Sequence, residues 1–300
     1  MITVFGSINA DLVCRVETHP HPGETVHGSD YALFPGGKGA NVALASRRAG
    51  ARVRLIGAVG DDDLANVALS ELEVSGAELF GVARVRGPTG LAIITVDARG
   101  ENTIVISAGA NRHVDGSVLS PADFSPGDTL VLQMEVPLEQ SLLTARAARA
   151  SGARVILMVA PFEPVAPADL EAVSMLIVNQ HEAADFARHL GLRAATPAET
   201  VGALAQRLGR TVIATLGAEG AVAATGSEVV SVPAIPVTPV DTTGAGDTFA
   251  GVMAAFLDEG ADLKTAMAYA AVAGSLACTK PGAQPSFPMR AEIEAALPRS

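Results

Sequence analysis

Hydrophobic positions along the chain fall into two kinds of segment. Short runs of aliphatic and β-branched residues predict buried parallel strands at Ile2–Phe5, Val53–Ile56, Leu130–Gln133, Val155–Val159, Leu176–Val178 and Val212–Thr215. Longer Ala- and Leu-rich stretches between them predict helices at Gly39–Arg48, Leu64–Val74, Leu138–Ala150, Glu182–Leu190 and Ala198–Leu208. Because strands and helices alternate, the pattern predicts an α/β fold with a central, mostly parallel sheet flanked by helices. Ligands of such folds bind at the carboxyl ends of the strands.

Two regions interrupt this alternation. Val13–Val16 and Thr25–Leu33 predict two short strands, and Leu91–Val96 with Thr103–Ser107 predict a hairpin that turns at Arg99-Gly100. Four strands without helices between them predict a small separate sheet that closes over a site as a lid. We therefore assign residues 12–34 and 91–107 to a β lid, and residues 1–11, 35–90 and 108–300 to an α/β catalytic core.

Composition narrows the classes of function. The chain has 300 residues, of which 49% are hydrophobic and 18% charged, so it can build a large core. Its net charge of −11 argues against a nucleic-acid partner. The two cysteines are far apart, no stretch reaches the roughly 20 apolar residues of a membrane span, and the first residues lack the basic flank of a signal peptide. The sequence thus predicts a soluble cytoplasmic protein without a membrane partner.

The segment from Asp241 to Phe249 contains the strongest chemical signal. Gly244 and Gly246 precede an apolar helical run, and free backbone N–H groups at a helix start bind anions such as phosphate. Asp247 stands in the first turn, where a carboxylate can take a proton from a hydroxyl during phosphoryl transfer. Taken alone, the segment could equally be a glycine turn followed by a capping Asp.

A second glycine-rich segment runs from Pro35 to Asn41. It is not a Walker P-loop, because Gly39 rather than Ser or Thr follows Lys38. Lys38 and Asn41 are three residues apart on a helix start, which suits a polyhydroxylated ligand, although a capped glycine loop is the alternative.

Polar residues also follow several predicted strands. Asn9 and Asp11 share a face if the chain stays extended, and Asp11 could then accept two sugar hydroxyls rather than form an Asx turn. Glu135 follows another strand. Asn179 with Glu182 could hold waters on Mg²⁺, although Glu182 could simply stabilise its helix. Thr215–Gly220 is a strand running into a glycine turn that could contact a nucleotide.

Together, these motifs resemble the ribokinase-like carbohydrate kinases, the PfkB family. The resemblance covers essentially the whole chain. It rests on an ordered set of motifs: Gly6–Asp11, Pro22–Thr25, Pro35–Asn41, Gly57–Asp62, Ala108–Asn111, Asn179–Glu182, Thr215–Gly220, Asp241–Asp247 and Lys280–Ser286.

The resemblance implies a Rossmann-like core with a β lid, and a homodimer in which the lids of two subunits pair. It implies ATP-dependent phosphorylation of D-ribose on its 5-hydroxyl, with Mg²⁺ and an activating K⁺. A related acceptor, such as 2-deoxyribose, another sugar or a nucleoside, is the alternative, and a catalytically silent sugar-binding protein is a third possibility.

The resemblance also implies roles for individual residues. Asp247 would be the base and Gly244, Ala245 and Gly246 the anion hole. The residues matching the family's sugar site, besides Asp247, are Asn9, Asp11, Gly37, Lys38, Asn41, Ala92, Ile94 and Glu135. The nucleotide-side positions are Asn179, Thr215, Gly217, Gly220 and Gly246, with Asn179 and Glu182 holding Mg²⁺ through water. The K⁺ ligands would come from Asp241, Thr243, Ala277, Lys280, Gly282 and Ser286. The chain departs from the family pattern at Ala271, Cys278 and Pro281, near the nucleotide and cation positions.

Overall fold

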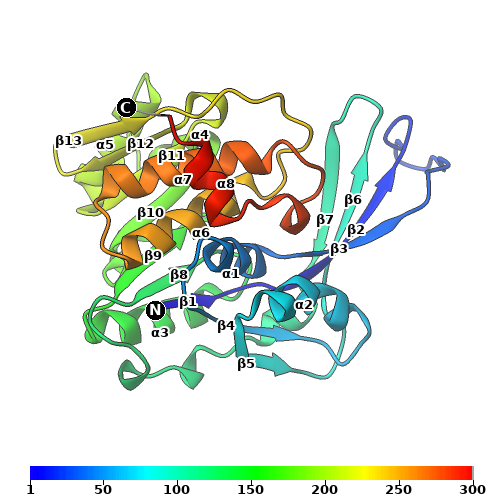
Figure 1. Cartoon of the computed structure of the whole chain (residues 1–300), viewed down its shortest axis with the longest axis horizontal. Helices are drawn as coiled ribbons and strands as arrows, with labels where there is room; N and C mark the ends of the chain where they lie inside the picture. The colour runs from blue at the N-terminus through cyan, green and yellow to red at the C-terminus, as the bar shows by residue number, and fades with distance from the viewer. Residues whose placement is uncertain (299–300) are drawn as a thin grey trace.

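A nine-stranded sheet forms the centre of the protein. The computed structural model describes residues 1–298 (Figure 1). The strand order is β13-β12-β11-β10-β9-β8-β1-β4-β5, in which β11 to β5 are parallel and β12 and β13 add an antiparallel edge. The strands are β1 (Ile2–Phe5), β4 (Val53–Val59), β5 (Glu78–Arg84), β8 (Thr129–Leu132), β9 (Arg154–Met158), β10 (Met175–Asn179), β11 (Thr211–Thr215), β12 (Ala221–Thr225) and β13 (Glu228–Val232).

Helices cover both faces of this sheet. Neighbouring strand residues such as Val4 and Phe5 belong to opposite core clusters, because side chains alternate across a strand. One face packs against α1 (Lys38–Arg48), α2 (Leu64–Ser75), α6 (Ala245–Asp258), α7 (Leu263–Ala277) and α8 (Arg290–Ala296). The other packs against α3 (Leu138–Ala150), α4 (Gln180–His189) and α5 (Pro197–Leu208). The predicted α/β class with a mostly parallel central sheet is confirmed.

A smaller, four-stranded sheet stands beside the large one, in the order β3-β2-β6-β7. Its strands are β2 (Asn9–Arg15), β3 (Ala32–Gly36), β6 (Gly90–Val96) and β7 (Asn102–Ser107). Strand β2 pairs antiparallel with β3 and parallel with β6, and β6 pairs antiparallel with β7. The hairpin predicted at 91–107 is therefore confirmed.

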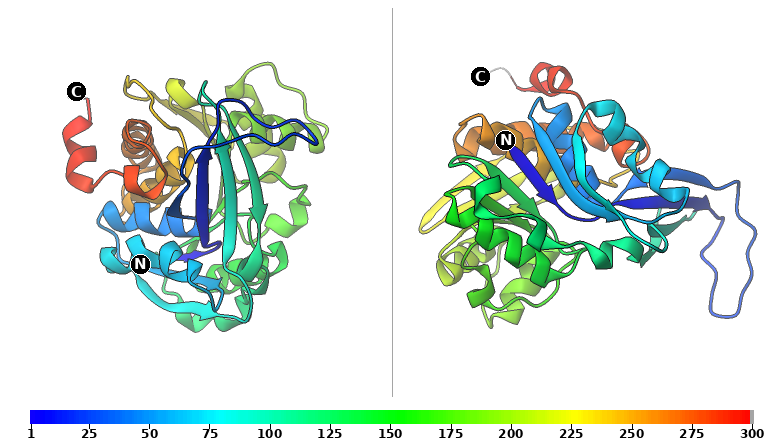
Figure 2. Two further views of the ribbon diagram at one scale, coloured as in Figure 1. Left: turned by 90° about the vertical axis from the view of Figure 1, so that its right-hand side faces the viewer. Right: turned by 90° about the horizontal axis from the view of Figure 1, so that it is seen from below.

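The strand predicted at Thr25–Leu33 is wrong over most of its length. The chain between β2 and β3 projects from the small sheet as a loop (Figure 2), with one isolated bridge between Val16 and Gly28. Regular pairing begins only at Ala32 and continues to Gly36. The alternation of apolar and polar residues did not predict a strand correctly here. Residues 25–31 are largely exposed and pair with no neighbouring strand, so neither of their faces is buried against a core.

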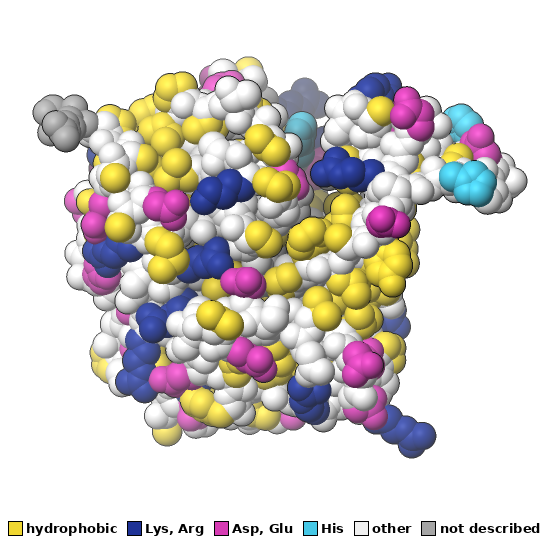
Figure 3. Space-filling model, turned by 45° about the vertical axis from the view of Figure 1, so that its right-hand side comes forward, with side chains coloured by type: hydrophobic (Ala, Val, Ile, Leu, Met, Phe, Trp, Pro, Cys, Tyr) yellow, Lys and Arg dark blue, Asp and Glu magenta, His cyan; other side chains and the backbone are white. Residues whose placement is uncertain are grey.

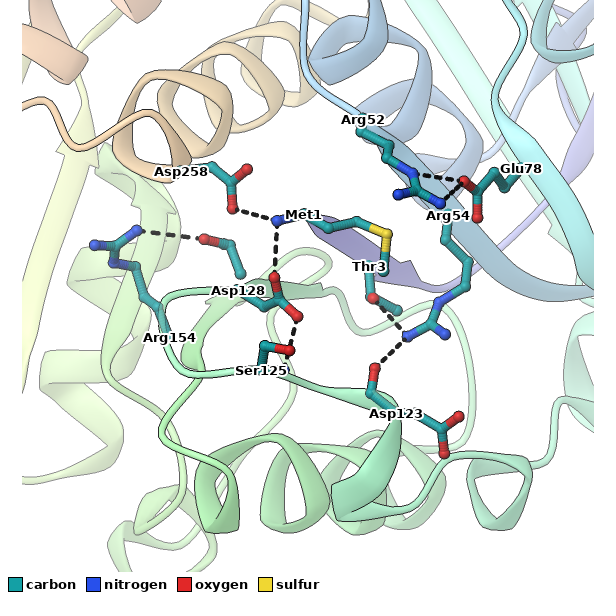
Figure 4. Close-up of polar contacts among 11 residues, drawn as sticks. Met1, Thr3, Arg52, Arg54, Glu78, Asp123, Ser125, Asp128, Arg154 and Asp258 are labelled. Atoms are coloured by element: carbon teal, nitrogen blue, oxygen red, sulfur yellow. Dashed lines mark hydrogen bonds and ion pairs between the residues drawn. The ribbon is translucent and has the colours of Figure 1, made fainter.

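The amino-terminal edge of the large sheet is held by polar contacts (Figure 4). The α-amino group of Met1 donates to Asp128 at 2.8 Å and to Asp258 at 3.1 Å. The buried guanidinium of Arg54 donates to the hydroxyl of Thr3 at 2.9 Å. Ligands of such folds bind at the opposite, carboxyl-terminal ends of the strands. No helix within residues 1–298 is long and apolar enough to cross a bilayer.

Candidate active site

The chain changes its winding direction between two neighbouring strands, β1 and β8. From β1 the sheet grows through β4 to β5, and from β8 it grows the other way through β9 and β10. Such a switch point leaves a crevice at the carboxyl ends of the two strands. Ser7, after β1, donates its hydroxyl to Glu135 Oε2 at 2.6 Å, and the backbone N–H of Lys38 reaches the same oxygen at 3.2 Å. Glu135 therefore joins three distant segments at the crevice.

The loop between β3 and α1 packs directly against the end of β1. Gly37 has φ of +87°, and a Cβ there would stand 2.7 Å from the backbone nitrogen of Asn9. A Cβ on Gly39 would stand 2.6 Å from the carbonyl carbon of Gly6. Glycine is needed at both positions because backbone meets backbone. This contact places the first turn of α1, with Lys38 and Asn41, at the carboxyl end of β1.

The start of α6 forms the floor of the site. Gly244 caps the helix with φ of +76°, and a Cβ on Gly246 would meet open space rather than protein. Asp247 follows in the first turn and is only 6% exposed. The side-chain amide of Asn41 donates to Asp247 Oδ2 at 2.8 Å, and Gln284 donates to Asn41 Oδ1 at 3.0 Å. The carboxylate is thus held in one orientation.

The buried carboxylates influence one another. Burial, together with the negative charges of Glu135 and Asp247, raises the pKa of Asp11 to about 7, while Lys38 opposes the shift. Burial also raises the pKa of Asp247 against the opposing effects of Lys38 and of the hydrogen bond from Asn41. In turn, the charge of Asp247, aided by Glu135 and Glu182, raises the pKa of Lys38 despite burial. One fixed cation therefore sits among four acidic side chains.

A cavity of about 460 Å³ opens over Asp247 and the start of α6. Lys38, Gly244 and Gly246 line one side, and Asn179, Thr215 and Gly217 line the other. Glu182 also faces this cavity, with one oxygen accepting the Asn179 N–H at 2.7 Å as part of a capping box. Burial raises the pKa of Glu182.

The residues present fit a magnesium ion held through water. Within residues 1–298, no group of three or more His, Cys, Asp and Glu side chains is placed to hold a metal ion. One oxygen of Glu182 accepts the Asn179 N–H, and the second would face a hydrated ion of the kind that Mg²⁺ forms.

A second, more apolar cavity of about 570 Å³ adjoins the first. The two share Thr215, Gly217, Thr242 and Gly246 as lining residues. The remaining lining is mainly aliphatic and includes Val237, Phe249 and Ala271. Gly220 lies on its edge, but a Cβ there would stand 2.1 Å from the Val232 carbonyl oxygen, so this glycine is required by the β12–β13 hairpin itself.

The small sheet closes the other side of the crevice. In its register, Asp11 pairs with Phe34 on β3 and with Ala92 on β6, so their side chains lie on one face. Ala92 and Ile94 are 6% and 8% exposed. Asp11, Phe34 and Ile94 line a cavity of about 360 Å³ together with the loops around Asp241 and Gly282. Asn9, Asp11, Ala92 and Ile94 thus lie on the same face of the small sheet, the face toward the crevice.

Asp241 joins two loops beside the start of α6. Its carboxylate accepts the N–H and hydroxyl of Thr243, at 2.9 and 2.6 Å, and the N–H of Gly282 at 2.8 Å. Although burial acts the other way, these hydrogen bonds lower its pKa, so it stays ionised. No N–H or O–H within residues 1–298 donates to the carbonyls of Thr243, Lys280 or Gly282. Free carbonyls around an ionised carboxylate fit a monovalent cation. Ala277 ends α7, whereas Ser286 donates its hydroxyl to the Ala283 carbonyl at 2.7 Å.

Three supporting side chains carried no predicted role. Ser7 holds Glu135, Gln284 holds Asn41, and Asn111 donates to Asn9 Oδ1 at 2.7 Å while accepting the Ile8 N–H at 2.9 Å. Asn111 and Asn9 are 102 residues apart, and Gln284 and Asn41 are 243 apart. A motif of a few consecutive residues does not indicate contacts between side chains that are so far apart in the sequence. All three nevertheless stand in motifs on which the family resemblance rests.

Comparison with known proteins agrees with this geometry. The family described as "pfkB family carbohydrate kinase" matches residues 1–290. A ribokinase of Schizosaccharomyces pombe is 35% identical over 310 residues, covering 98% of this chain and 96% of the relative. The crystal structure of a ribokinase from Thermotoga maritima superposes with a TM-score of 0.90 at 33% identity, covering 99% of this chain and 98% of that one. Arabidopsis thaliana ribokinase complexed with ribose and ATP gives 0.89 at 30% identity, covering 100% of this chain and 99% of the other.

Proposed function

This chain belongs to the pfkB family of carbohydrate kinases, and we propose that it transfers a phosphoryl group from ATP to the 5-hydroxyl of D-ribose, giving ribose 5-phosphate and ADP. The observation that carries the proposal is the place of Asp247. This buried carboxylate stands at a glycine helix start, between a nucleotide-sized cavity and the inner face of the small sheet. The ribose and ATP complex of the Arabidopsis relative supports the same pair of ligands.

The polar groups of the crevice suit a small sugar. Asn9, Asp11 and Asn41 present amide and carboxylate groups that can pair with several hydroxyls, and Glu135 and Lys38 add a charge of each sign. Ala92 and Ile94 supply the apolar cover on the inner face of the small sheet. Gly37 permits the close packing that holds this set together. We assign the small sheet the role of a lid, which would exclude water during transfer.

Asp247 is the proposed base. Its raised pKa brings it nearer to neutrality than an exposed carboxyl, which favours proton acceptance from a hydroxyl. The N–H groups of Gly244 and Gly246 lie at the positive end of α6, where they would stabilise the transferring group. The Ala245 N–H lies between them and donates to the Thr242 carbonyl at 3.2 Å. Lys38, whose pKa is raised, stays charged and adds a cation to the same site.

The nucleotide would occupy the two adjoining cavities. Its phosphates would lie over Gly246 and Lys38, with Thr215 and Gly217 alongside, and its base would lie in the more apolar cavity near Ala271. Bound Mg²⁺ would neutralise phosphate charge, and Asn179 with Glu182 would hold it through water.

We extend the proposal to an activating K⁺ beside the anion hole. Asp241 and the carbonyls of Thr243, Ala277, Lys280 and Gly282 supply a ligand set, with Ser286 next to it. A cation there would offset the negative charge of Asp241 next to the phosphate site.

The experiment that tests the function measures ADP release from ATP and Mg²⁺ with D-ribose, 2-deoxyribose, fructose or adenosine, each with and without K⁺. Ribose-dependent turnover raised by K⁺ is the expected result. Turnover with another acceptor only would retain phosphoryl transfer and overturn ribose as substrate. Saturable ribose binding without ADP release would identify a silent sugar-binding protein.

A further inference from the structure

A separate pocket lies at the base of the small sheet. It is an open pocket of about 280 Å³, bordered by the connection between β5 and β6 and by the turn after β7. Arg86, Arg112, His113 and Ser107 line it, together with Pro88 and the backbone of Gly109 and Ala110. None of these residues lines the cavities assigned to sugar and nucleotide.

The positive charges of this pocket have no protein partner among residues 1–298. Neither Arg86 nor Arg112 forms an ion pair or a side-chain hydrogen bond, and the Ser107 hydroxyl also makes none, in contrast to Arg48, which pairs with Glu71 at 2.8 Å. No Asp or Glu lines the pocket. The neighbouring carboxylates are engaged elsewhere: Asp61 accepts the Gly87 N–H at 2.9 Å, and Asp62 accepts the Thr89 N–H and hydroxyl at 3.0 and 2.6 Å.

This donor set suits a tetrahedral dianion. Two guanidinium groups offer forked N–H donors that match phosphate oxygens, and an imidazole and a hydroxyl add single donors. In a chain of net charge −11, such a carboxylate-free cluster is a local exception. We propose that this pocket binds the phosphate group of a small metabolite, outside the catalytic crevice.

The turn that carries Arg112 also carries Asn111. Asn111 holds Asn9 and the Ile8 N–H at the acceptor site. A phosphate drawn into the pocket would therefore act on the turn that positions a sugar-binding side chain. Because linkage is reciprocal, phosphate and ribose affinities would change together.

Calorimetric titration tests the proposal. Protein saturated with ribose and a non-hydrolysable ATP analogue, so that the catalytic anion hole is filled, is titrated with inorganic phosphate and separately with ribose 5-phosphate. One site per chain is expected, and the double variant Arg86→Gln, Arg112→Gln should weaken binding at least about tenfold. Tighter binding of ribose 5-phosphate would identify a sugar phosphate as the ligand, and equal binding would identify free phosphate.

Arg146→Gln is the matched control, since Arg146 is an exposed arginine on α3 that lines none of these cavities. It should bind phosphate like the wild type. An unchanged thermal midpoint would show that the double variant folds. Equal affinity in the wild type and the double variant, or no binding by the wild type at millimolar phosphate, would overturn the site. Ribose affinity that is the same with and without phosphate would contradict the link through Asn111. Because binding rather than turnover is measured, loss of this phosphate site is distinguished from failure of phosphoryl transfer to ribose.

Discussion

Burial and neighbouring charges shift the pKa of Asp11 far from that of an exposed carboxyl group. It is 9% exposed and lies near two other carboxylates, so its pKa rises to about 7. Since the pKa of Asp11 in the folded chain exceeds the ordinary value of 3.8, its ionisation opposes folding increasingly as pH rises from about 4 to 7. A buried carboxyl group that lowers the stability of the folded chain at neutral pH is consistent with a role in ligand binding.

Ribose binding should therefore depend on pH. Only ionised Asp11 accepts two hydroxyls, and the free protein loses that form as pH falls through about 7. We expect ribose affinity, measured by calorimetry, to fall about tenfold from pH 8 to pH 6. Asp11→Asn should bind ribose more weakly and show no such dependence. A wild-type affinity that is flat between these pH values would contradict the role of Asp11.

Asp247 is predicted to act on turnover rather than on binding. Asp247→Ala should lower kcat by about 10²–10⁴-fold, because a positioned base is lost, while ribose binding is largely kept. Single-turnover ADP release and ribose calorimetry separate the two effects. Asp185→Ala, which changes an exposed acid on α4, is the matched control. Near-normal turnover of the Asp247 variant would exclude it as the base.

At the scale of elements, the contact between α1 and β1 depends on the absence of side chains. The first turn of α1 reaches the backbone after β1 at Gly39, where a Cβ would stand 2.7 Å from the Ser7 nitrogen. Helix α5 contains a comparable glycine, Gly202, where a Cβ would meet nothing within 4 Å. Gly39 is thus needed for close packing of α1 on β1, whereas no close packing requires a glycine at position 202.

Replacing each with alanine should separate close packing from helix propensity. Gly39→Ala is expected to destabilise the protein by about 1–3 kcal/mol and to raise KM for the sugar, because α1 must move away from β1. Gly202→Ala should stabilise it by about 0.5–1 kcal/mol, since alanine is the better helix former. Urea unfolding measures both. Equal changes in the free energy of unfolding for the two variants would show that the close contact between Gly39 and the backbone after β1 does not require glycine.

At the scale of the whole molecule, the outer face of the small sheet carries an exposed row of apolar side chains. Leu33, Leu12, Ile93 and Val105 pair in register across all four strands and point away from Asp11. Ile93 is 43% exposed and Val105 65%. Hydrophobic side chains gather on this side of the molecule (Figure 3). A continuous exposed apolar row of this kind favours burial against a partner.

We propose that this row pairs the lids of two subunits in a homodimer. Ile93→Glu should give a monomer, because a charge on a buried interface is costly, and light scattering after gel filtration reports the mass. Val229→Glu, at an exposed position on the edge strand β13, is the control and should leave the mass unchanged. A wild-type mass of one chain would exclude the dimer.

The sequence by itself determined the fold class, because strand and helix periods are local. It also determined most candidate residues, because glycine-rich turns and strand-end carboxylates leave local signals at Gly37, Gly244 and Asp247. It missed β5, an edge strand that is only partly buried, and α8, a helix of seven residues, because neither shows a clear hydrophobic period. Tertiary structure alone decided how the site is supported. Asn41 meets Asp247, Asn111 meets Asn9, and Ser7 meets Glu135 only after distant strand ends converge at the switch point. The raised pKa of Asp11 likewise exists only in the folded chain, since burial and neighbouring charges cause it.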